Sequence, residues 1–451
     1  MKQPHSKILS ALVIVLCLAL LAGGGWLLLQ TLPQSRTQQP DALQTDGVFS
    51  TEQPTVEPER EAPYLGTLPD AADALPEDEP AADSDPSTQP EPDRETEPDS
   101  PVMQRAQALL GTMTQEEKIW QLFFVTPEAI TGVETATLAG NATKQALAQY
   151  PVGGLIYFAK NLETQEQAVN LLANTQSYSK IPLFLGVDEE GGTVSRIGAN
   201  DALGGTLVSD MRTLGRSADP AQVYTAGQTL AANLTRLGFN LDFAPVADVA
   251  SGADSVIGSR SFSSEPELCA SLAGVVVKSL RDGGVASCLK HFPGYGSATV
   301  DDHNGTSIVE KSLSELLACD LIPFQSVIAD EQSVPFVMVS HLSYPNVTGS
   351  DTPADLSAAI VTDILRDKLE YENIIITDSH AMASITDHYT PGEAAVQALM
   401  AGCDMILMPD DLQAAYAAVA AAVQDGTLPS SRIDESVLRI LRIKLEYGIL
   451  S

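Results

Sequence analysis

The feature that most constrains the fold of this chain is a regular alternation, after residue 100, of short apolar runs with longer amphipathic stretches. Short apolar runs bounded by turn residues are typical of buried strands, and amphipathic stretches of ten or more residues are typical of helices. The expected strands are Trp120–Val125, Gly154–Phe158, Leu183–Val187, Leu241–Pro245, Val285–Leu289, Pro335–Ser340, Ile374–Thr377 and Met405–Met408. The expected helices between them include Gln165–Gln176, Ala221–Leu237, Glu267–Arg281, Ser312–Ala329, Leu356–Leu369 and Gly392–Ala401. This order predicts an α/β fold, a closed (β/α)8 or TIM-like barrel over residues 101–451.

Polar residues stand at or just beyond the ends of these expected strands. They are Asp188, Asp248, Lys290, His291, His341 and Asp378. In a (β/α)8 barrel the carboxyl ends of the strands carry the active site. The sequence therefore predicts one site to which several strands contribute.

One stretch concentrates titratable groups more than any other. Lys290 and His291 end an apolar run, a Pro/Gly-rich turn follows, and Asp301, Asp302 and His303 come soon after it. The whole chain has six histidines, so two of them twelve residues apart around glycine turns indicate an active-site loop.

The N-terminal hundred residues have a different composition. Residues 8–33 are almost wholly apolar and free of charge, and Lys2 and Lys7 precede them, which predicts a single membrane span after a cytoplasmic tail of residues 1–7. A cleaved signal segment, giving a secreted protein, is the alternative. Residues 34–100 are rich in Pro and acidic residues, which predicts a disordered linker that holds an extracytoplasmic domain away from the membrane.

Composition excludes some functions. The net charge of −34 argues against binding to nucleic acid, because an acidic surface repels phosphate. Four cysteines, Cys269, Cys288, Cys319 and Cys403, stand in apolar contexts without C-x-x-C spacing, which favours buried free thiols over zinc ligands and leaves any disulfide pairing open. No dinucleotide fingerprint or phosphate-binding loop motif is present, so we expect no metal and no cofactor.

Four motifs together resemble glycoside hydrolase family 3, and within it the single-barrel β-N-acetylhexosaminidases, over residues 102–450. They are Gly186–Arg196, Val256–Phe262, Lys290–His303 and Ile376–Met382. Two residues depart from the family pattern, since relatives usually have an aliphatic residue where His380 stands and often a polar non-aromatic residue or histidine where Tyr295 stands. The resemblance thus implies family chemistry in a pocket with an altered rim.

The resemblance assigns catalytic roles. Asp378 follows a β-branched run, and the matching aspartate of the family is the nucleophile that forms a covalent glycosyl intermediate. Read from the residues alone, Asp378 could instead be a helix N-cap. The Asp-x-His pattern resembles a dyad in which His303 is the general acid/base and Asp301 orients it, with Asp302 as an alternative orienting residue and a structural His–Asp pair as another interpretation.

The same resemblance assigns substrate-binding roles to five residues, Asp188, Arg196, Arg260, Lys290 and His291. Arg196 could instead form an ion pair with Glu190. We expect Asp248 and His341 to support these groups rather than touch the sugar. Gly191 and Gly192 are expected to form a tight turn near the site.

The implied activity is exo-acting, retaining hydrolysis of terminal N-acetylglucosamine from glycans such as cell-wall fragments. A β-glucosidase or β-xylosidase of the same family and an inactive wall-binding barrel are the alternatives. A histidine acid/base also tolerates an incoming anion better than a carboxylate does, so phosphorolysis stays open beside hydrolysis.

Overall fold

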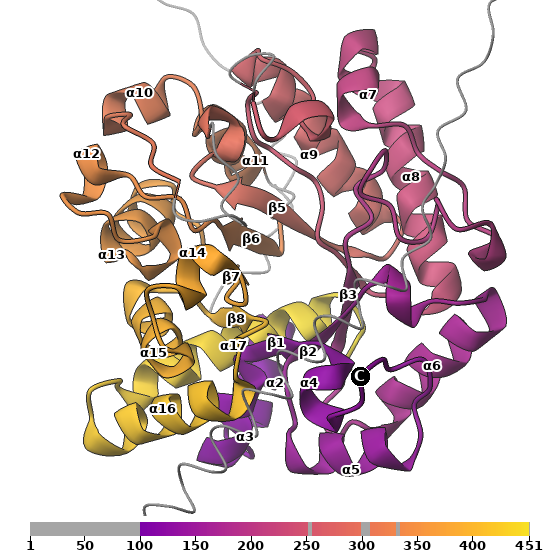
Figure 1. Cartoon of the computed structure of the whole chain (residues 1–451), viewed down its shortest axis with the longest axis vertical. Helices are drawn as coiled ribbons and strands as arrows, with labels where there is room; N and C mark the ends of the chain where they lie inside the picture. Colours follow the sequence, from indigo (N-terminus) through magenta and orange to yellow (C-terminus); the bar gives the residue numbers. More distant parts are fainter. Residues whose placement is uncertain (1–99, 251–254, 299–306, 331–333, 451) are drawn as a thin grey trace, which may run out of the picture. The chain divides into compact units, whose positions relative to one another are not determined.

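The computed structural model describes residues 100–250, 255–298, 307–330 and 334–450. In this part of the chain eight parallel strands close into a barrel in sequence order, and helices surround it (Figure 1). The strands are β1 (Phe123–Val125), β2 (Gly154–Tyr157), β3 (Phe184–Val187), β4 (Leu241–Asp242), β5 (Ala286–Phe292), β6 (Phe336–Val339), β7 (Ile374–Ser379) and β8 (Met405–Leu407). Pairing of Phe123 with Ile406 and of Phe124 with Leu407 joins β1 to β8 and closes the ring. The predicted (β/α)8 barrel is therefore confirmed.

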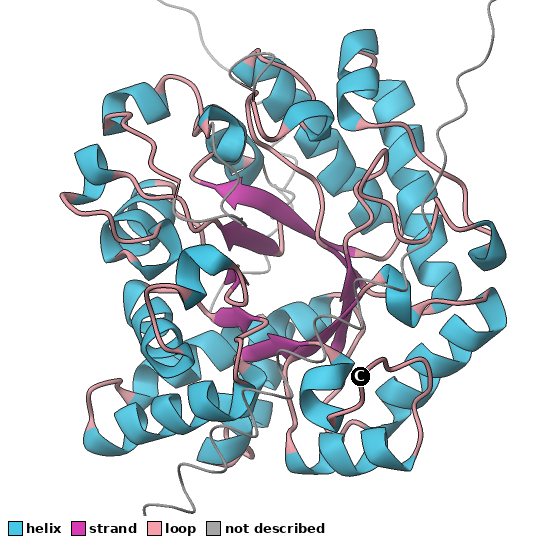
Figure 2. Ribbon diagram, viewed as in Figure 1, coloured by secondary structure: helices cyan, strands magenta, loops and turns pink. Residues whose placement is uncertain are grey.

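Helices form the outer layer, and the strands form the inner ring (Figure 2). The α-helices are α2 (Pro101–Leu110), α3 (Gln115–Gln121), α4 (Pro127–Thr131), α5 (Asn141–Gln149), α6 (Gln165–Tyr178), α7 (Met211–Ser217), α8 (Pro220–Leu237), α9 (Pro266–Asp282), α10 (Leu313–Leu317), α11 (Ile322–Ala329), α12 (Pro345–Thr348), α13 (Ala358–Ile360), α14 (Ala383–Thr386), α15 (Pro391–Ala401), α16 (Leu412–Asp425) and α17 (Ser430–Glu446). Short helical segments are η1 (Ala159–Asn161), η2 (Asp201–Leu203), η3 (Gly258–Arg260), η4 (Tyr295–Ser297), η6 (Ala354–Leu356) and η7 (Val361–Lys368).

Aromatic rings fill the inside of the barrel, and glycines make room for them. The rings of Phe124 and Phe243 meet edge to face with centroids 5.2 Å apart. A Cβ added to Gly154 would lie 2.3 Å from the Phe124 ring, and one added to Gly186 would lie 2.8 Å from the Phe243 ring. The barrel is thus a packed core, and any substrate must bind at one of its ends.

The strand register shifts at two places that matter for function. Between β5 and β6 it shifts between Leu289 and Phe292, and between β7 and β8 it shifts between Ile376 and Ser379. The first shift contains Lys290 and His291, and the second contains Asp378. Such irregularities re-aim side chains at the ends of strands, which fits a site built from these residues.

Several predicted boundaries were wrong. Trp120 belongs to α3 rather than to the first strand, because a capping box at Thr114 and Glu117 starts a helix and the Trp120 ring stacks on Tyr416 at 3.9 Å, outside the barrel. The strand predicted to run to Pro245 ends at Asp242, and the chain beyond it keeps only separate contacts with β5, such as the bridge between Val246 and Lys290.

Two predicted helices also differ. The helix predicted over residues 312–329 is divided into α10 and α11, with Pro323 near the start of the second, where a missing N–H costs little. The helix predicted from Leu356 begins later, at α13, and continues as the wide-turned η7.

In the described ranges, no helix combines the length and apolar character that a membrane span requires. The predicted span at residues 8–33 and nearly all of the predicted linker lie outside those ranges. The first described helix, α2, begins at Pro101, and the Ser100 hydroxyl caps it by accepting a hydrogen bond from the Met103 N–H at 3.1 Å.

Candidate active site

The polar residues predicted to lie at strand ends do gather at one end of the barrel. Asp188 follows β3, Lys290 and His291 lie within the last part of β5, and Asp378 lies near the end of β7. Because the strands are parallel, all of these positions are at the carboxyl-terminal end of the ring.

Lys290 is buried between two carboxylates. Its Nζ lies 2.7 Å from Asp188 Oδ1 and 2.7 Å from Glu190 Oε1. Burial alone would lower the pKa of Lys290, but the charges of Asp188 and Glu190 outweigh burial and raise it. Lys290 is therefore positively charged, and two carboxylates hold its ammonium group in place.

Glu190 is shared by two cations. Arg260 donates to it with Nε at 2.7 Å and Nη2 at 2.8 Å, beside the contact from Lys290. Burial alone would raise the pKa of Glu190, but Lys290 and Arg260 hold it well below its ordinary value. The alternative in which Arg196 pairs with Glu190 is wrong, since Arg260 occupies that role.

His291 is oriented by Asp248. The Nδ1 atom of His291 lies 2.7 Å from Asp248 Oδ2, and Asp248 also accepts the backbone N–H groups of His291 and Tyr295. The other ring nitrogen lies 3.4 Å from Nη2 of Arg260. Asp248 therefore fixes the orientation of the His291 ring.

Asp378 is half-buried and its Oδ1 accepts the Ser379 N–H at 2.7 Å. Burial would raise the pKa of Asp378, but the positive charges that His291 and His341 can carry outweigh it, so the pKa is lowered. The N-cap interpretation of Asp378 is wrong, because the residue lies in β7 and the next helix, α14, has Met382 as its N-cap. An ionised carboxylate is the form that a nucleophile requires.

Arg196 sits on a loop that Glu189 holds in place. Glu189 accepts the backbone N–H groups of Arg196, Ile197 and Gly198 and the Ser195 hydroxyl, at 2.6 to 2.8 Å. The side chain of Arg196 is half-buried, and its Nε has no hydrogen-bond partner among the described residues. A buried donor without a partner suits a group that binds a ligand.

The predicted glycine turn is present in this loop. Gly191 and Gly192 have φ values of +88° and +57°, which side chains with a Cβ rarely adopt. A Cβ on Gly192 would also lie 2.6 Å from Cβ of Asp210. This turn directly follows the segment from Asp188 to Glu190, whose carboxylates contact Lys290.

His303, Asp301 and Asp302 lie outside the described residues. The two described segments that flank them are joined by one carboxylate, Asp320. Its Oδ1 accepts the Ser297 hydroxyl at 3.0 Å and its Oδ2 lies 2.5 Å from Nζ of Lys311. Asp320 could not be singled out from the sequence, because its partners lie 23 and 9 residues away.

The cysteines match their prediction in most respects. Cys269, Cys288 and Cys403 are buried free thiols, and Cys319 is free but only half-buried.

Comparison with known proteins decides the family. A model of the glycosyl hydrolase family 3 N-terminal domain matches residues 114–443. The chain belongs to glycosyl hydrolase family 3.

Similar proteins in this family include two curated enzymes. The beta-hexosaminidase A of Pseudoalteromonas piscicida is 32% identical over 328 residues, which cover 66% of this chain and 54% of that protein. The beta-hexosaminidase LpqI of Mycobacterium tuberculosis is 37% identical over 273 residues, which cover 58% of this chain and 68% of that protein. The chain thus spans about half the length of the first relative and two thirds of the second.

A solved structure shares the fold. The family 3 beta-N-acetylglucosaminidase from Paenibacillus sp. is 34% identical with a TM-score of 0.70, and the match covers 75% of this chain and 63% of that one.

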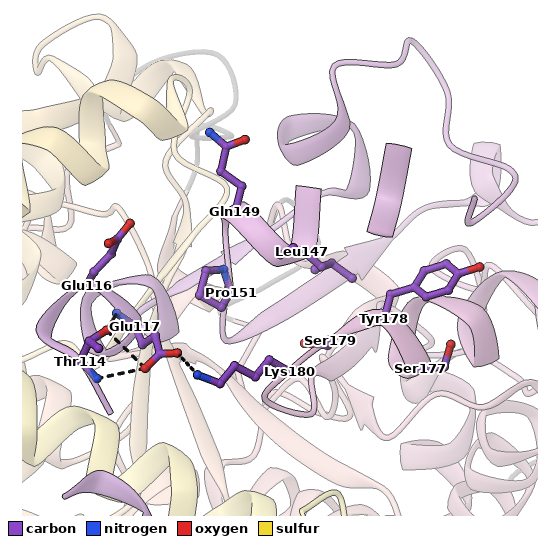
Figure 3. Close-up of a pocket in the computed structure, with 11 residues that line it drawn as sticks. Thr114, Glu116, Glu117, Leu147, Gln149, Pro151, Ser177, Tyr178, Ser179 and Lys180 are labelled. Carbon is purple, nitrogen blue, oxygen red and sulfur yellow. Dashed lines mark hydrogen bonds and ion pairs between the residues drawn. The ribbon is translucent and has the colours of Figure 1, made fainter. Parts of the chain in front are cut away.

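A pocket at the opposite end of the family 3 barrel is not the active site. It has a volume of about 570 Å³, and Glu117, Pro151 and Lys180 are among the residues that line it (Figure 3). These residues precede β1, β2 and β3, so they lie at the amino-terminal ends of the strands. An ion pair between Glu117 and Lys180 spans the pocket.

Proposed function

We propose that this family 3 protein is a retaining exo-β-N-acetylhexosaminidase that releases terminal N-acetylglucosamine from glycans such as cell-wall fragments. The observation that carries the proposal is the ionised Asp378 at the end of β7, in the same end of the barrel as the cluster of Asp188, Lys290, Glu190 and Arg260. The names of the similar proteins, beta-hexosaminidase and beta-N-acetylglucosaminidase, support this substrate class.

The binding residues have chemistry suited to a neutral sugar. Asp188 accepts hydrogen bonds from hydroxyl groups, while Arg196, Arg260, Lys290 and His291 can donate them. Because Lys290 and Arg260 are paired with Asp188 and Glu190, these four residues can hold an uncharged ring through charge-assisted hydrogen bonds without leaving one of their charges alone.

The reaction has two steps in this proposal. In the first, a carboxylate oxygen of Asp378 attacks the anomeric carbon while the leaving-group oxygen departs with a proton from His303. In the second, His303 takes a proton from water, the water oxygen attacks the anomeric carbon, and the bond to Asp378 breaks. Asp301, or Asp302 in its place, orients the His303 ring. If phosphate replaces water, the product is a sugar 1-phosphate.

A panel of aryl β-glycosides tests the substrate class. We expect turnover of the N-acetylglucosaminide at a rate far above those of the glucoside and the xyloside. A preference for the glucoside or xyloside would favour the other branches of the family, and no turnover of any substrate would favour an inactive barrel.

Trapping tests the nucleophile. A 5-fluoro N-acetylglucosaminyl fluoride should label Asp378, and Asp378→Asn should remove both labelling and turnover while the thermal melting temperature stays near that of the parent. A label on a peptide that lacks Asp378 would overturn the assignment.

We further propose that residues 8–33 anchor the enzyme in the cell membrane, with the barrel outside. The apolar run, the preceding Lys2 and Lys7 and the acidic, Pro-rich sequence of residues 34–100 support this. Protease treatment of intact cells should then release an active fragment that begins near Pro101. Activity found only in the cytosol, or a mature N-terminus near Gly25, would contradict the anchor.

A further inference from the structure

A second pocket lies at the carboxyl-terminal end of the barrel. Its volume is about 630 Å³, and the residues that line it are Ile308, Asp351, Thr352, Pro353, His388 and Tyr389. They come from the segments after β5, β6 and β7, and they precede α11, η7 and α15, which return the chain to the other end. The pocket is therefore at the same end as Asp378, and its size is within the range of ligand pockets.

Backbone pairing fixes one wall of this pocket. Ile308 pairs with Ser343 in parallel orientation, and Ser343 pairs with Pro353 in antiparallel orientation. The Ser343 N–H donates to the Ser307 carbonyl at 3.0 Å, and the Ser343 hydroxyl donates to the Asp351 carbonyl at 2.7 Å. Because this wall is formed in advance, a ligand that binds here has little backbone to order.

The side chains of the pocket combine apolar and polar groups. Tyr389 is half-buried, and Ile308 is 50% exposed although it is a large apolar residue. An aromatic ring and an aliphatic side chain can contact the apolar faces of a sugar ring, while the Asp351 carboxylate and the Thr352 hydroxyl can accept hydrogen bonds from its hydroxyl groups. This is the composition of a site for a polar ligand with apolar faces.

The pocket lies close to the proposed nucleophile. Burial and the charge of Asp355 raise the pKa of Tyr389, so Asp355 is near the phenol ring. The Oδ2 atom of Asp355 in turn lies 2.8 Å from Nε2 of His380, and His380 stands two residues after Asp378. These contacts connect the Tyr389 wall to the end of β7.

The residues proposed to bind the terminal sugar come from a different part of the ring. Asp188 follows β3, Arg260 lies in η3 after β4, and Lys290 lies in β5. A retaining glycosidase has its proton donor beside the leaving-group oxygen. Ile308 stands five residues after the proposed donor, His303, in the sequence. The pocket thus fits the leaving-group side of the bond that is cleaved.

We propose that this pocket is the subsite for the leaving group and that it takes an uncharged pyranose, with Tyr389 and Ile308 as its apolar contacts. The inference rests on the proposed function, because it takes a β-N-acetylglucosaminide as the substrate. The Asp351 carboxylate disfavours an anionic leaving group, and the net charge of −34 acts in the same direction.

The main test compares two substrates in the parent enzyme and in Tyr389→Ala. N,N′-diacetylchitobiose has a pyranose as its leaving group, whereas methyl N-acetyl-β-glucosaminide has the same terminal sugar and no second ring. We expect Tyr389→Ala to lower kcat/KM about 10-fold on the disaccharide and less than about 2-fold on the methyl glycoside, because only the disaccharide contacts the ring. Tyr389→Phe should retain the ring contact and most of the activity on both. Equal losses on both substrates would overturn the proposal.

Ile308→Ser is a second test that leaves the fold intact, because the side chain is half exposed. Its loss should again be confined to the disaccharide. Tyr178→Ala is the matched control, since Tyr178 is another half-buried tyrosine that lines the pocket at the amino-terminal end (Figure 3), and both substrates should react as in the parent. The thermal melting temperature of each variant reports folding. Parent-like rates on the disaccharide in both Tyr389→Ala and Ile308→Ser would contradict the subsite.

The charge of the leaving group can be tested separately. A disaccharide with a uronic acid as its second ring should be a poorer substrate than N,N′-diacetylchitobiose, and Asp351→Asn should reduce the difference, because it removes a like charge. A preference of the parent for the acidic disaccharide would overturn the assignment of an uncharged leaving group.

Direct binding separates failure of the subsite from failure of the proposed function. In Asp378→Asn, calorimetry should show binding of N,N′-diacetylchitobiose that weakens about 10-fold when Tyr389→Ala is added, while binding of N-acetylglucosamine is unchanged. If the parent cleaves neither N-acetylglucosaminide, the proposed function fails. If the parent cleaves both and Tyr389→Ala leaves the affinity for the disaccharide unchanged, only the subsite fails.

Discussion

Arg260 and Glu190 form a two-point ion pair, although they lie 70 residues apart in the sequence. Glu190 is buried and also contacts Lys290, so one carboxylate neutralises two cations of the site. Asp188 neutralises the remaining charge through its contact with Lys290. The side chains that we propose to bind the sugar are therefore held in place by one another in the absence of any ligand.

Glu190→Gln should be costly for both stability and activity. Removing one partner of a buried ion pair typically costs about 3–5 kcal/mol, because the remaining charges stay buried. Urea unfolding at pH 7 should show this loss, and KM should rise as Arg260 and Lys290 lose their positions. Glu163→Gln, at an exposed position, should change neither.

The loss of stability in Glu190→Gln should depend on pH. The pKa of Glu190 is lowered in the folded state, so its contribution to stability is complete above its ordinary pKa of 4.5 and declines as pH falls below that value. The stability gap between parent and Glu190→Gln should be constant above about pH 5 and narrow in more acidic solution. A gap that widens in acid would contradict the ion-pair account.

Asp320→Asn should weaken acid/base catalysis. Asp320 joins Ser297 and Lys311, which flank the segment that carries Asp301 and His303. We expect a larger loss of kcat/KM on substrates with poor leaving groups than on activated aryl glycosides. Asp330→Asn, an exposed change at the end of α11, serves as the control. Equal losses on both substrate classes would mean that Asp320 acts on the fold as a whole.

His303→Ala tests the acid/base directly. Loss of general acid catalysis typically costs 10²- to 10⁴-fold, and the loss should fall mainly on poor leaving groups, since a stable leaving anion needs little protonation. The basic limb of the kcat/KM profile should also disappear. If activated and unactivated substrates slow equally, His303 has a structural role instead.

The sequence predicted the architecture well, because eight buried strands with helices between them leave a distinctive pattern. It also placed Asp188, Lys290 and Asp378 at one end of the barrel, since the ends of parallel strands share an edge. It failed at the start of β1, because a short apolar run that contains Trp120 fits a buried helix end as well as a strand.

The sequence could not show which distant residues contact one another in the fold. Nothing local in the chain indicates that Glu190 pairs with Arg260 rather than Arg196, because the choice depends on where η3 sits against the loop after β3. The contact of His380 with Asp355 likewise joins residues 25 positions apart. The departure of His380 from the family pattern was visible, but its partner was not.

Lys444, at the other end of the barrel, should make the stability of the protein depend on pH. It is fully buried in α17, donates to Gln121 Oε1 at 2.7 Å and lies 5.2 Å from the Phe184 ring centroid. Burial lowers its pKa to about 7, from an ordinary value of 10.5. Between these values the unfolded chain binds more protons than the folded one, so stability should rise as pH increases from 7 to 10.5. Each pKa unit corresponds to about 1.4 kcal/mol, so the rise is measurable by urea unfolding.

Lys444→Met should flatten the rise, whereas Lys368→Met, at an exposed position, should retain it. A parent enzyme whose stability is constant or falls over this range would show that the buried amine keeps its ordinary pKa.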